Sequence, residues 1–235
     1  MLKQLFAALI MLFAAGLTQA QPTAGNEYRV LATPQPTDIP GKIEVLEFFW
    51  YGCPHCYDFE PVLEPWVKKL PKDVHFQRIP AMFNDEYARG ARAFYALDAI
   101  GQEERLHKAL FDAVHTGARL RVGDEAALTE WLGKHGVDTK KFTAAYHSFS
   151  VESKLKRSAQ LTQAYKIDGV PSMAVNGKYV VNTDNIRSFE QLLAVTDYLI
   201  GKERKLVSKP APAKGNKPAE KHKPQKKHKP AKKEE

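Results

Sequence analysis

The two cysteines of this sequence, Cys53 and Cys56, constrain it most, because each can form an intramolecular disulfide only with the other. A bridge between residues so close in sequence closes a very small loop and restricts the unfolded chain little, so it adds little stability. The pair is therefore better suited to redox chemistry or to metal binding than to holding a fold together.

The cysteines stand between a predicted strand and a predicted helix. Segment 43–50, with the sequence IEVLEFFW, is β-branched and aromatic, and it is apolar on both faces apart from its glutamates. This pattern is typical of a central strand in a sheet that is covered on both sides. Tyr51-Gly52 ends the strand, and Pro54 suits the first position of a helix, where its missing N–H costs nothing. Apolar residues continue at helical spacing to Leu70.

A thiol at the start of a helix has an unusual environment. The unpaired N–H groups and the positive end of the helix dipole stabilise an anion, so we expect the pKa of Cys53 to be lowered. Cys56 lies one turn further in, and we expect it to be less exposed and to re-form the internal bond. His55 could stabilise the Cys53 thiolate as a cation or as an N–H donor. The alternative is an exposed histidine without a role.

Metal binding is the other use of such a cysteine pair. A closed zinc site needs about four ligands, and the rest of the chain offers neither a second cysteine pair nor histidines at a ligand spacing. We therefore expect no metal and no cofactor. The histidines outside the cysteine motif are expected to pack or to lie on the surface: His75, His107, His115, His135 and His147.

The remaining pattern predicts an αβ unit, a block of helices and a second αβ unit. We expect an edge strand at 28–31, a second central strand at 74–79, helices at 88–100, 105–115, 125–134 and 141–163, strands at 172–175 and 178–181, and a closing helix at 188–200. Asn176-Gly177 between the last two strands is a strong hairpin signal.

Several of these motifs together resemble a known family. The Cys-Pro-His-Cys centre follows a Leu-Glu-Phe-Phe strand, Pro61 stands eight residues after the first cysteine, Gly169-Val170-Pro171 precedes the hairpin, and segment 175–179 reads Val-Asn-Gly-Lys-Tyr. Over about residues 27–200 the chain resembles the DsbA family of periplasmic disulfide oxidases, in the thioredoxin superfamily.

This resemblance implies the α/β class, with a thioredoxin-like fold and an inserted all-helical domain. The thioredoxin-like domain would comprise residues 27–84 and 165–201, and the inserted helical domain residues 85–164. The resemblance also implies that Val170-Pro171 is a cis peptide that faces the disulfide, where a substrate strand pairs with the Val170 backbone.

For the reacting groups, the resemblance implies that Cys53 is the attacked sulfur and Cys56 its partner. Pro54 and His55 stand between the two cysteines. Thioredoxin-type reductants resemble Cys-Gly-Pro-Cys instead, so this Pro-His dipeptide argues against a reductant. Glu47 would be a buried acid that manages protons beneath the disulfide, with Arg78 as its candidate partner. The alternative is a glutamate at the edge of the sheet.

The implied activity is the introduction of disulfide bonds into newly exported proteins that carry free thiols. Reoxidation would need a membrane quinone-linked oxidase that resembles DsbB. Two alternatives stay open. One is an exported reductant or disulfide isomerase, and the other is a chaperone-like module that binds unfolded chains at an aromatic surface around Trp50 and Tyr51.

The two ends of the chain differ from its body. Residues 1–20 carry one cation, Lys3, and then an apolar run from Leu5 to Leu17. This pattern predicts a signal peptide that is cleaved after Ala20 and a soluble periplasmic protein. Residues 202–235 hold thirteen Lys or Arg, four Glu and five Pro, and we expect them to form a disordered tail that can bind an anionic envelope surface. The net charge of these residues alone is larger than the +8 of the whole chain, so the body between the two ends is nearly neutral. We therefore expect no nucleic-acid partner.

Overall fold

A computed structural model of the chain describes residues 21–117 and 119–207. The predicted signal peptide and the sequence after Val207 lie outside the described residues. The elements, in chain order, are β1 (Tyr28–Val30), β2 (Ile43–Phe49), α2 (Pro54–Val67), β3 (Val74–Pro80), α3 (Asp85–Ala99), α4 (Glu103–His115), α5 (Glu125–Lys134), α6 (Thr139–Tyr146), α7 (Phe149–Ala164), β4 (Ser172–Val175), β5 (Tyr179–Val181), a 3-10 turn (Thr183–Asn185) and α8 (Phe189–Val207).

The strands form one sheet in the order β1-β5-β4-β2-β3. Strand β2 pairs in parallel with β3 and antiparallel with β4, and all seven of its residues are buried. The register places Glu47 of β2 directly opposite Arg78 of β3. The hairpin between β4 and β5 turns at Asn176 and Gly177, whose φ angles are 52° and 67°. These positive angles explain why the sequence has an Asn-Gly pair here.

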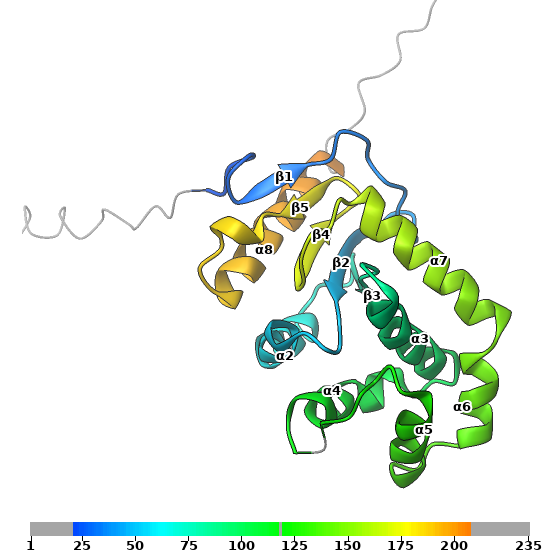
Figure 1. Ribbon diagram of the computed structural model, residues 1–235. Helices are drawn as coiled ribbons and strands as arrows, with labels where there is room; N and C mark the ends of the chain where they lie inside the picture. The colour runs from blue at the N-terminus through cyan, green and yellow to red at the C-terminus, as the bar shows by residue number, and fades with distance from the viewer. Residues whose placement is uncertain (1–20, 118, 208–235) are drawn as a thin grey trace, which may run out of the picture.

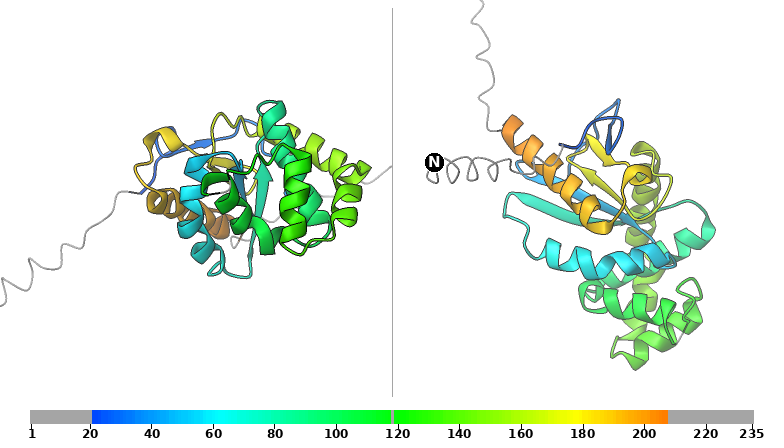
Figure 2. Two further views of the ribbon diagram at one scale, coloured as in Figure 1. Left: turned by 60° about the horizontal axis from the view of Figure 1, so that its bottom comes forward. Right: turned by 90° about the vertical axis from the view of Figure 1, so that its left-hand side faces the viewer.

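The two faces of β2 pack into different cores. Ile43 and Val45 contact apolar residues of α2 and α8, whereas Leu46 and Phe48 pack with a cluster on the other face that includes Tyr165. A third core fills the block of helices α3 to α7 and includes Cys53 and Cys56. Figure 1 and Figure 2 show α2 between α8 and this helical block, in agreement with its contacts to both α8 and α4. The cysteines therefore lie where the sheet meets the helical block.

Three sequence expectations are corrected. Strand β3, predicted to be central, is an edge strand, and its middle residues are only partly buried. The single helix predicted at 141–163 is two helices, because the Ser148 hydroxyl caps a new helix by accepting the Val151 N–H at 3.2 Å. The tail does not begin at Lys202, because α8 continues to Val207.

The extra turns of α8 belong to the folded body. Glu203 is fully buried, and its carboxylate lies 2.6 Å from Lys178 Nζ and accepts a hydrogen bond from Asn176 Nδ2 at 2.5 Å. These contacts tie the end of α8 to the hairpin. Within residues 21–117 and 119–207, no helix combines the length and the apolar character needed to cross a bilayer.

Candidate active site

Cys53 is the N-cap of α2, and Pro54 is the first residue of the helix, as the sequence predicts. The Cys53 sulfur accepts the Cys56 backbone N–H at 3.4 Å. Only 7% of the surface of Cys53 is exposed, and Cys56 is fully buried. The difference in exposure makes Cys53 the sulfur that an incoming thiolate can reach. His55 is exposed beside it.

The two sulfurs differ strongly in acidity. A hydrogen bond from the Cys56 thiol lowers the pKa of Cys53 to about 6, with further help from the backbone N–H groups of Cys56 and His55 and from the charge of His55. Partial burial opposes this effect but does not cancel it. Burial raises the pKa of Cys56 well above its ordinary value, and the neighbouring Cys53 raises it further. In the reduced pair at neutral pH, Cys53 is thus mostly a thiolate and Cys56 a thiol.

The loop before β4 faces this pair. The Val170–Pro171 peptide is cis, which confirms the expectation for it. The Val170 carbonyl oxygen lies 3.4 Å from the Cys53 sulfur. A pocket of about 580 Å³, here called the Val170 pocket, adjoins this contact and is lined by residues that include His55, Val170, Pro171, Ile186, Phe189 and Leu192. A polypeptide at Cys53 would therefore meet the backbone of Val170 and an apolar surface at the start of α8.

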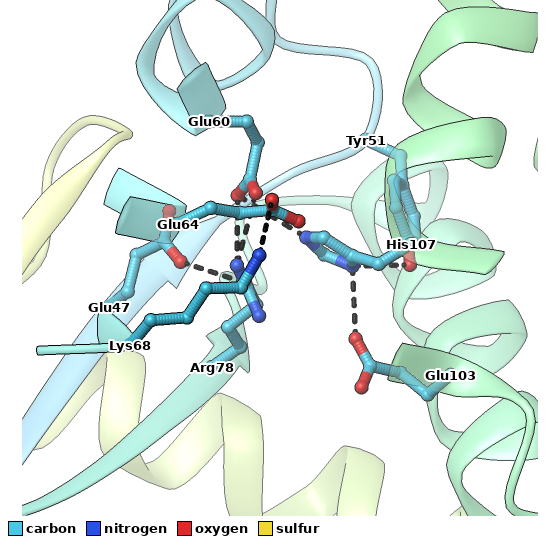
Figure 3. Close-up of polar contacts among 8 residues, drawn as sticks. All are labelled: Glu47, Tyr51, Glu60, Glu64, Lys68, Arg78, Glu103 and His107. Atoms are coloured by element: carbon cyan, nitrogen blue, oxygen red, sulfur yellow. Dashed lines mark hydrogen bonds and ion pairs between the residues drawn. The ribbon is translucent and has the colours of Figure 1, made fainter. Parts of the chain in front are cut away.

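Glu47 lies in a buried cluster of charged groups (Figure 3). It has no exposed surface, and its carboxylate lies 3.2 Å from Arg78 Nε. Arg78 is thus the partner predicted for it, and Glu47 is on a central strand rather than at the edge of the sheet. Arg78 also donates from Nη2 to Glu60 of α2 at 3.0 Å. Neither Glu47 oxygen accepts a hydrogen bond from the described residues.

His107 extends this cluster into the helical block. It is buried, with Nε2 3.3 Å from Glu60 and Nδ1 3.0 Å from Glu103 (Figure 3). The Tyr51 hydroxyl also lies 2.9 Å from Nδ1. His107 packs in the core, as expected, with ring contacts to Phe49 and Phe111, but it also joins this charged cluster, which the sequence analysis does not predict. Two spacings in the sequence are relevant to this cluster. Glu60 follows Cys56 by four residues, which places it on the same helix face as that cysteine, and His107 follows Glu103 by four residues, a spacing at which helical side chains can contact.

The charges in this cluster shift the pKa values of its members. Burial raises the pKa of Glu47 to about 8, and the nearby Glu60 adds to this, while Arg78 opposes it. Burial also acts to raise the pKa of Glu60, but His107 and Arg78 outweigh it and the pKa is lowered. Burial acts to lower the pKa of His107, but its bonds to Glu103 and Glu60 raise it overall. Arg78 and His107 thus favour the ionised form of Glu60, whereas burial and the nearby Glu60 favour the protonated form of Glu47.

A second histidine that the sequence did not single out holds the turn before Cys53. His115 Nε2 lies 2.8 Å from the Tyr51 carbonyl oxygen, and its ring stacks on that of Tyr57 at 5.0 Å between centroids. Because His115 is on α4, the helical block contacts the backbone two residues before the reacting sulfur. The sequence separation of 64 residues left no local signal for this contact.

A profile of the DSBA-like thioredoxin domain matches residues 44–194, which include both cysteines and the Val170–Pro171 peptide. The chain belongs to this family. The thiol:disulfide interchange protein DsbA of Pseudomonas aeruginosa is 41% identical over 202 residues, which cover 86% of this chain and 95% of that protein. The protein of the same description from Azotobacter vinelandii is 45% identical over 192 residues, which cover 81% and 89%.

Solved structures of the DSBA family agree with the fold described above. The crystal structure of Pseudomonas aeruginosa DsbA matches with a TM-score of 0.77 at 42% identity, over 80% of this chain and 97% of that chain. Reduced DsbA1 of Neisseria meningitidis matches with a TM-score of 0.70 at 33% identity, over 80% and 97%. The thioredoxin-like fold is thereby confirmed, and this member of the family is a disulfide oxidoreductase.

Proposed function

We propose that this chain introduces disulfide bonds into newly exported proteins, by dithiol–disulfide exchange at Cys53 and Cys56. The observation that carries the direction of the reaction is the lowered pKa of Cys53, about 6. A stable Cys53 thiolate is a good leaving group, and it favours the reduced enzyme over the oxidised one. An enzyme with this preference withdraws electrons from its substrates.

The reaction proceeds in two exchanges. A substrate thiolate attacks the Cys53 sulfur of the Cys53–Cys56 disulfide, the bond between the two cysteines breaks, and the electron pair goes to the Cys56 sulfur. A mixed disulfide now joins the substrate to Cys53. A second substrate thiolate attacks the substrate sulfur of this bond, and Cys53 leaves as a thiolate. The substrate has gained a disulfide, and the enzyme has gained two electrons.

Glu47 provides the proton that the first exchange requires. The Cys56 thiolate that forms is buried, and its pKa is raised well above the ordinary value, so it must take up a proton. Glu47 is buried, carries a proton up to about pH 8, and interacts electrostatically with Cys56. Its proton can therefore neutralise the Cys56 thiolate, and the Glu47 carboxylate that remains lies 3.2 Å from the charged partner Arg78.

The cellular setting follows from the reaction and from the family. Substrates are exported proteins with free thiols, and the periplasm is the compartment in which such bonds persist. The reduced pair must pass two electrons to an acceptor, for which we propose a membrane quinone-linked oxidase that resembles DsbB. The alternative of a chaperone-like aromatic surface loses support, because only 1% of the surface of Tyr51 is exposed.

Oxidative refolding tests the proposal. The oxidised protein, at substoichiometric amounts with an excess of a quinone-linked oxidase, should restore activity to a reduced, unfolded substrate protein. Cys53→Ser should abolish this, and a distant surface substitution such as Lys141→Gln should not. If the protein reduced insulin disulfides efficiently but failed to oxidise the unfolded substrate, the reductant alternative would replace the proposal.

A further inference from the structure

A second pocket lies beside the turn that precedes Cys53, and it shares no lining residue with the Val170 pocket. It has a volume of about 470 Å³ and is lined by residues that include Trp50, Gly52, Glu86, Arg89, Arg119 and Arg121. We call it the arginine pocket. Gly52 directly precedes Cys53, and His55, which lines the Val170 pocket, follows two residues after it. Most residues that line the arginine pocket come from α3 and from the connection between α4 and α5, whereas the Val170 pocket is lined mainly by the loop before β4 and the start of α8.

The arginine pocket carries cations that have no internal partner. Arg89, Arg119 and Arg121 are exposed, and within residues 21–117 and 119–207 none of their guanidinium groups makes a hydrogen bond or an ion pair. Glu86 and Asp124 also line the pocket, but among the described residues neither carboxylate forms an ion pair with a guanidinium group. The Asp124 carboxylate instead caps α5 by accepting the Ala127 N–H at 3.1 Å. Three free guanidinium groups thus surround one hollow on a body whose net charge is close to zero.

Glycines give this hollow its shape. A Cβ atom on Gly123 would lie 3.0 Å from Arg89 Nε and 3.2 Å from Arg89 Cβ, so the arginine side chain lies directly over the glycine. A Cβ atom on Gly52 would lie 2.3 Å from the Trp50 indole, which stacks on Tyr87 at 4.2 Å between centroids. The pocket therefore has an aromatic wall beside Cys53 and a guanidinium group held along its other side.

We infer that the arginine pocket binds carboxylate side chains of the substrate polypeptide close to its reacting cysteine. This inference rests on the proposed oxidation of polypeptide thiols, and it names a preferred class of substrate. Guanidinium groups bind carboxylates through paired hydrogen bonds. An extended chain advances about 3.3 Å per residue, so a residue a few positions from the cysteine can reach the pocket while that cysteine is at Cys53.

The two pockets give the substrate a direction. One side of the substrate cysteine meets the apolar Val170 pocket, and the other meets the arginine pocket. Acidic residues should therefore accelerate the reaction when they stand on one side of the cysteine and not on the other. The contacts are at the surface, so we expect about a three- to tenfold effect on the second-order rate constant, reduced by salt.

Reduced dithiol peptides test the inference. Six peptides share one sequence except at a single residue pair, which is Glu-Glu, Gln-Gln or Lys-Lys. In three of them the pair stands two to four residues before the first cysteine, and in the other three it stands two to four residues after the second. The rate at which the oxidised full chain oxidises each peptide is measured at low and at high salt. We expect Glu-Glu to be about three- to tenfold faster than Gln-Gln in one of the two sets and Lys-Lys to be slower, with the differences shrinking at high salt.

Variants assign the effect to the pocket. In Arg89→Gln/Arg121→Gln, the ratio of the Glu-Glu rate to the Gln-Gln rate should fall to about one. Lys140→Gln/Lys141→Gln on α6 changes the net charge equally, outside both pockets, and should keep the wild-type ratio. Equal Glu-Glu and Gln-Gln rates in the wild type, or equal ratios in the two double variants, would overturn the inference and leave the proposed function intact. Failure to oxidise any of the peptides would instead count against the proposed function.

Discussion

The carboxylate of Glu47 lies 3.2 Å from Arg78 Nε, on paired neighbouring strands, and yet its pKa is raised to about 8. The ion pair is insufficient to keep Glu47 ionised, because Arg78 is also bonded to Glu60 and because the site is fully buried. A buried charge is stable only when its partners compensate its lost hydration. In this cluster Glu60 has the better partners, so Glu47 keeps the proton.

Glu47→Gln should therefore stabilise the protein at neutral pH. The unfolded carboxyl ionises near 4.5 and the folded one near 8, so the wild type loses stability as the pH rises through this interval. Gln cannot ionise, and we expect a gain in unfolding free energy of roughly 1–3 kcal/mol at pH 7 that vanishes near pH 4. Urea unfolding at the two pH values, in one redox state, measures it. A variant that is destabilised at pH 7 would show that Glu47 is ionised in the folded protein.

The same substitution should slow the reaction, if Glu47 supplies the proton to Cys56. We expect the rate of dithiol oxidation at pH 7 to fall about 10²-fold, at the low end of the effects of proton transfer by side chains. Stopped-flow measurement with a small reduced peptide checks it. The conservative variant Glu47→Asp keeps a titratable group and should retain more of the rate than Gln.

The two cysteines should have separate roles. Cys56→Ser leaves the acidic, reachable Cys53 in place and should accumulate mixed disulfides with substrates, whereas Cys53→Ser should abolish exchange. Non-reducing gel electrophoresis after reaction with an unfolded thiol protein separates the two results. Trapping by Cys53→Ser instead would reverse the roles assigned to the two sulfurs.

The reduced protein should gain stability relative to the oxidised one as the pH rises. The pKa of Cys53 is about 6 when folded and about 9 as an ordinary thiol, so its contribution is complete above pH 9 and lost as the pH falls through 6. At pH 7 it should be on the order of 1 kcal/mol, allowing for partial solvent exposure. Denaturant midpoints of both redox forms from pH 5 to pH 8 test this. A constant difference between the forms would contradict the lowered pKa.

Truncations should distinguish the end of α8 from the sequence beyond it. Removing the residues after Lys202 takes away Glu203, which bonds to Lys178 and Asn176, and Arg204, which bonds to Asp73. We expect a loss of roughly 2–4 kcal/mol in unfolding free energy. Removing only residues 208–235 should leave stability and the oxidation of a small dithiol unchanged, and should weaken binding to anionic vesicles at low salt. If both truncations were equally stable, the buried Glu203 contacts would contribute little.

Much of this architecture is readable from the sequence, because the signals are local. The apolar run of β2, the proline after Cys53 and the Asn-Gly pair each fix a backbone conformation within a few residues. The same run predicts that Glu47 is buried, since its neighbours on the strand are apolar. The split between α6 and α7 was missed because the periodicity of apolar residues continues across Ser148, which alone marks the new cap.

The charged cluster was predicted only in part, because its members come from distant segments. His107 lies 47 residues from Glu60 and 56 from Tyr51, and no local pattern joins these positions. The edge position of β3 depends on the order of strands in space, which the alternation of its side chains does not encode.

The redox potential of the Cys53/Cys56 pair tests the central claim most directly. Equilibration with glutathione buffers at pH 7 gives the potential, and Cys56→Ser serves as the control that cannot form the bond. A stabilised Cys53 thiolate predicts an oxidising pair, with a potential less negative than about −180 mV, the value typical of protein disulfide isomerase. A potential near −270 mV, as in thioredoxin, would show that the pair is a reductant and would contradict the proposed direction of electron flow.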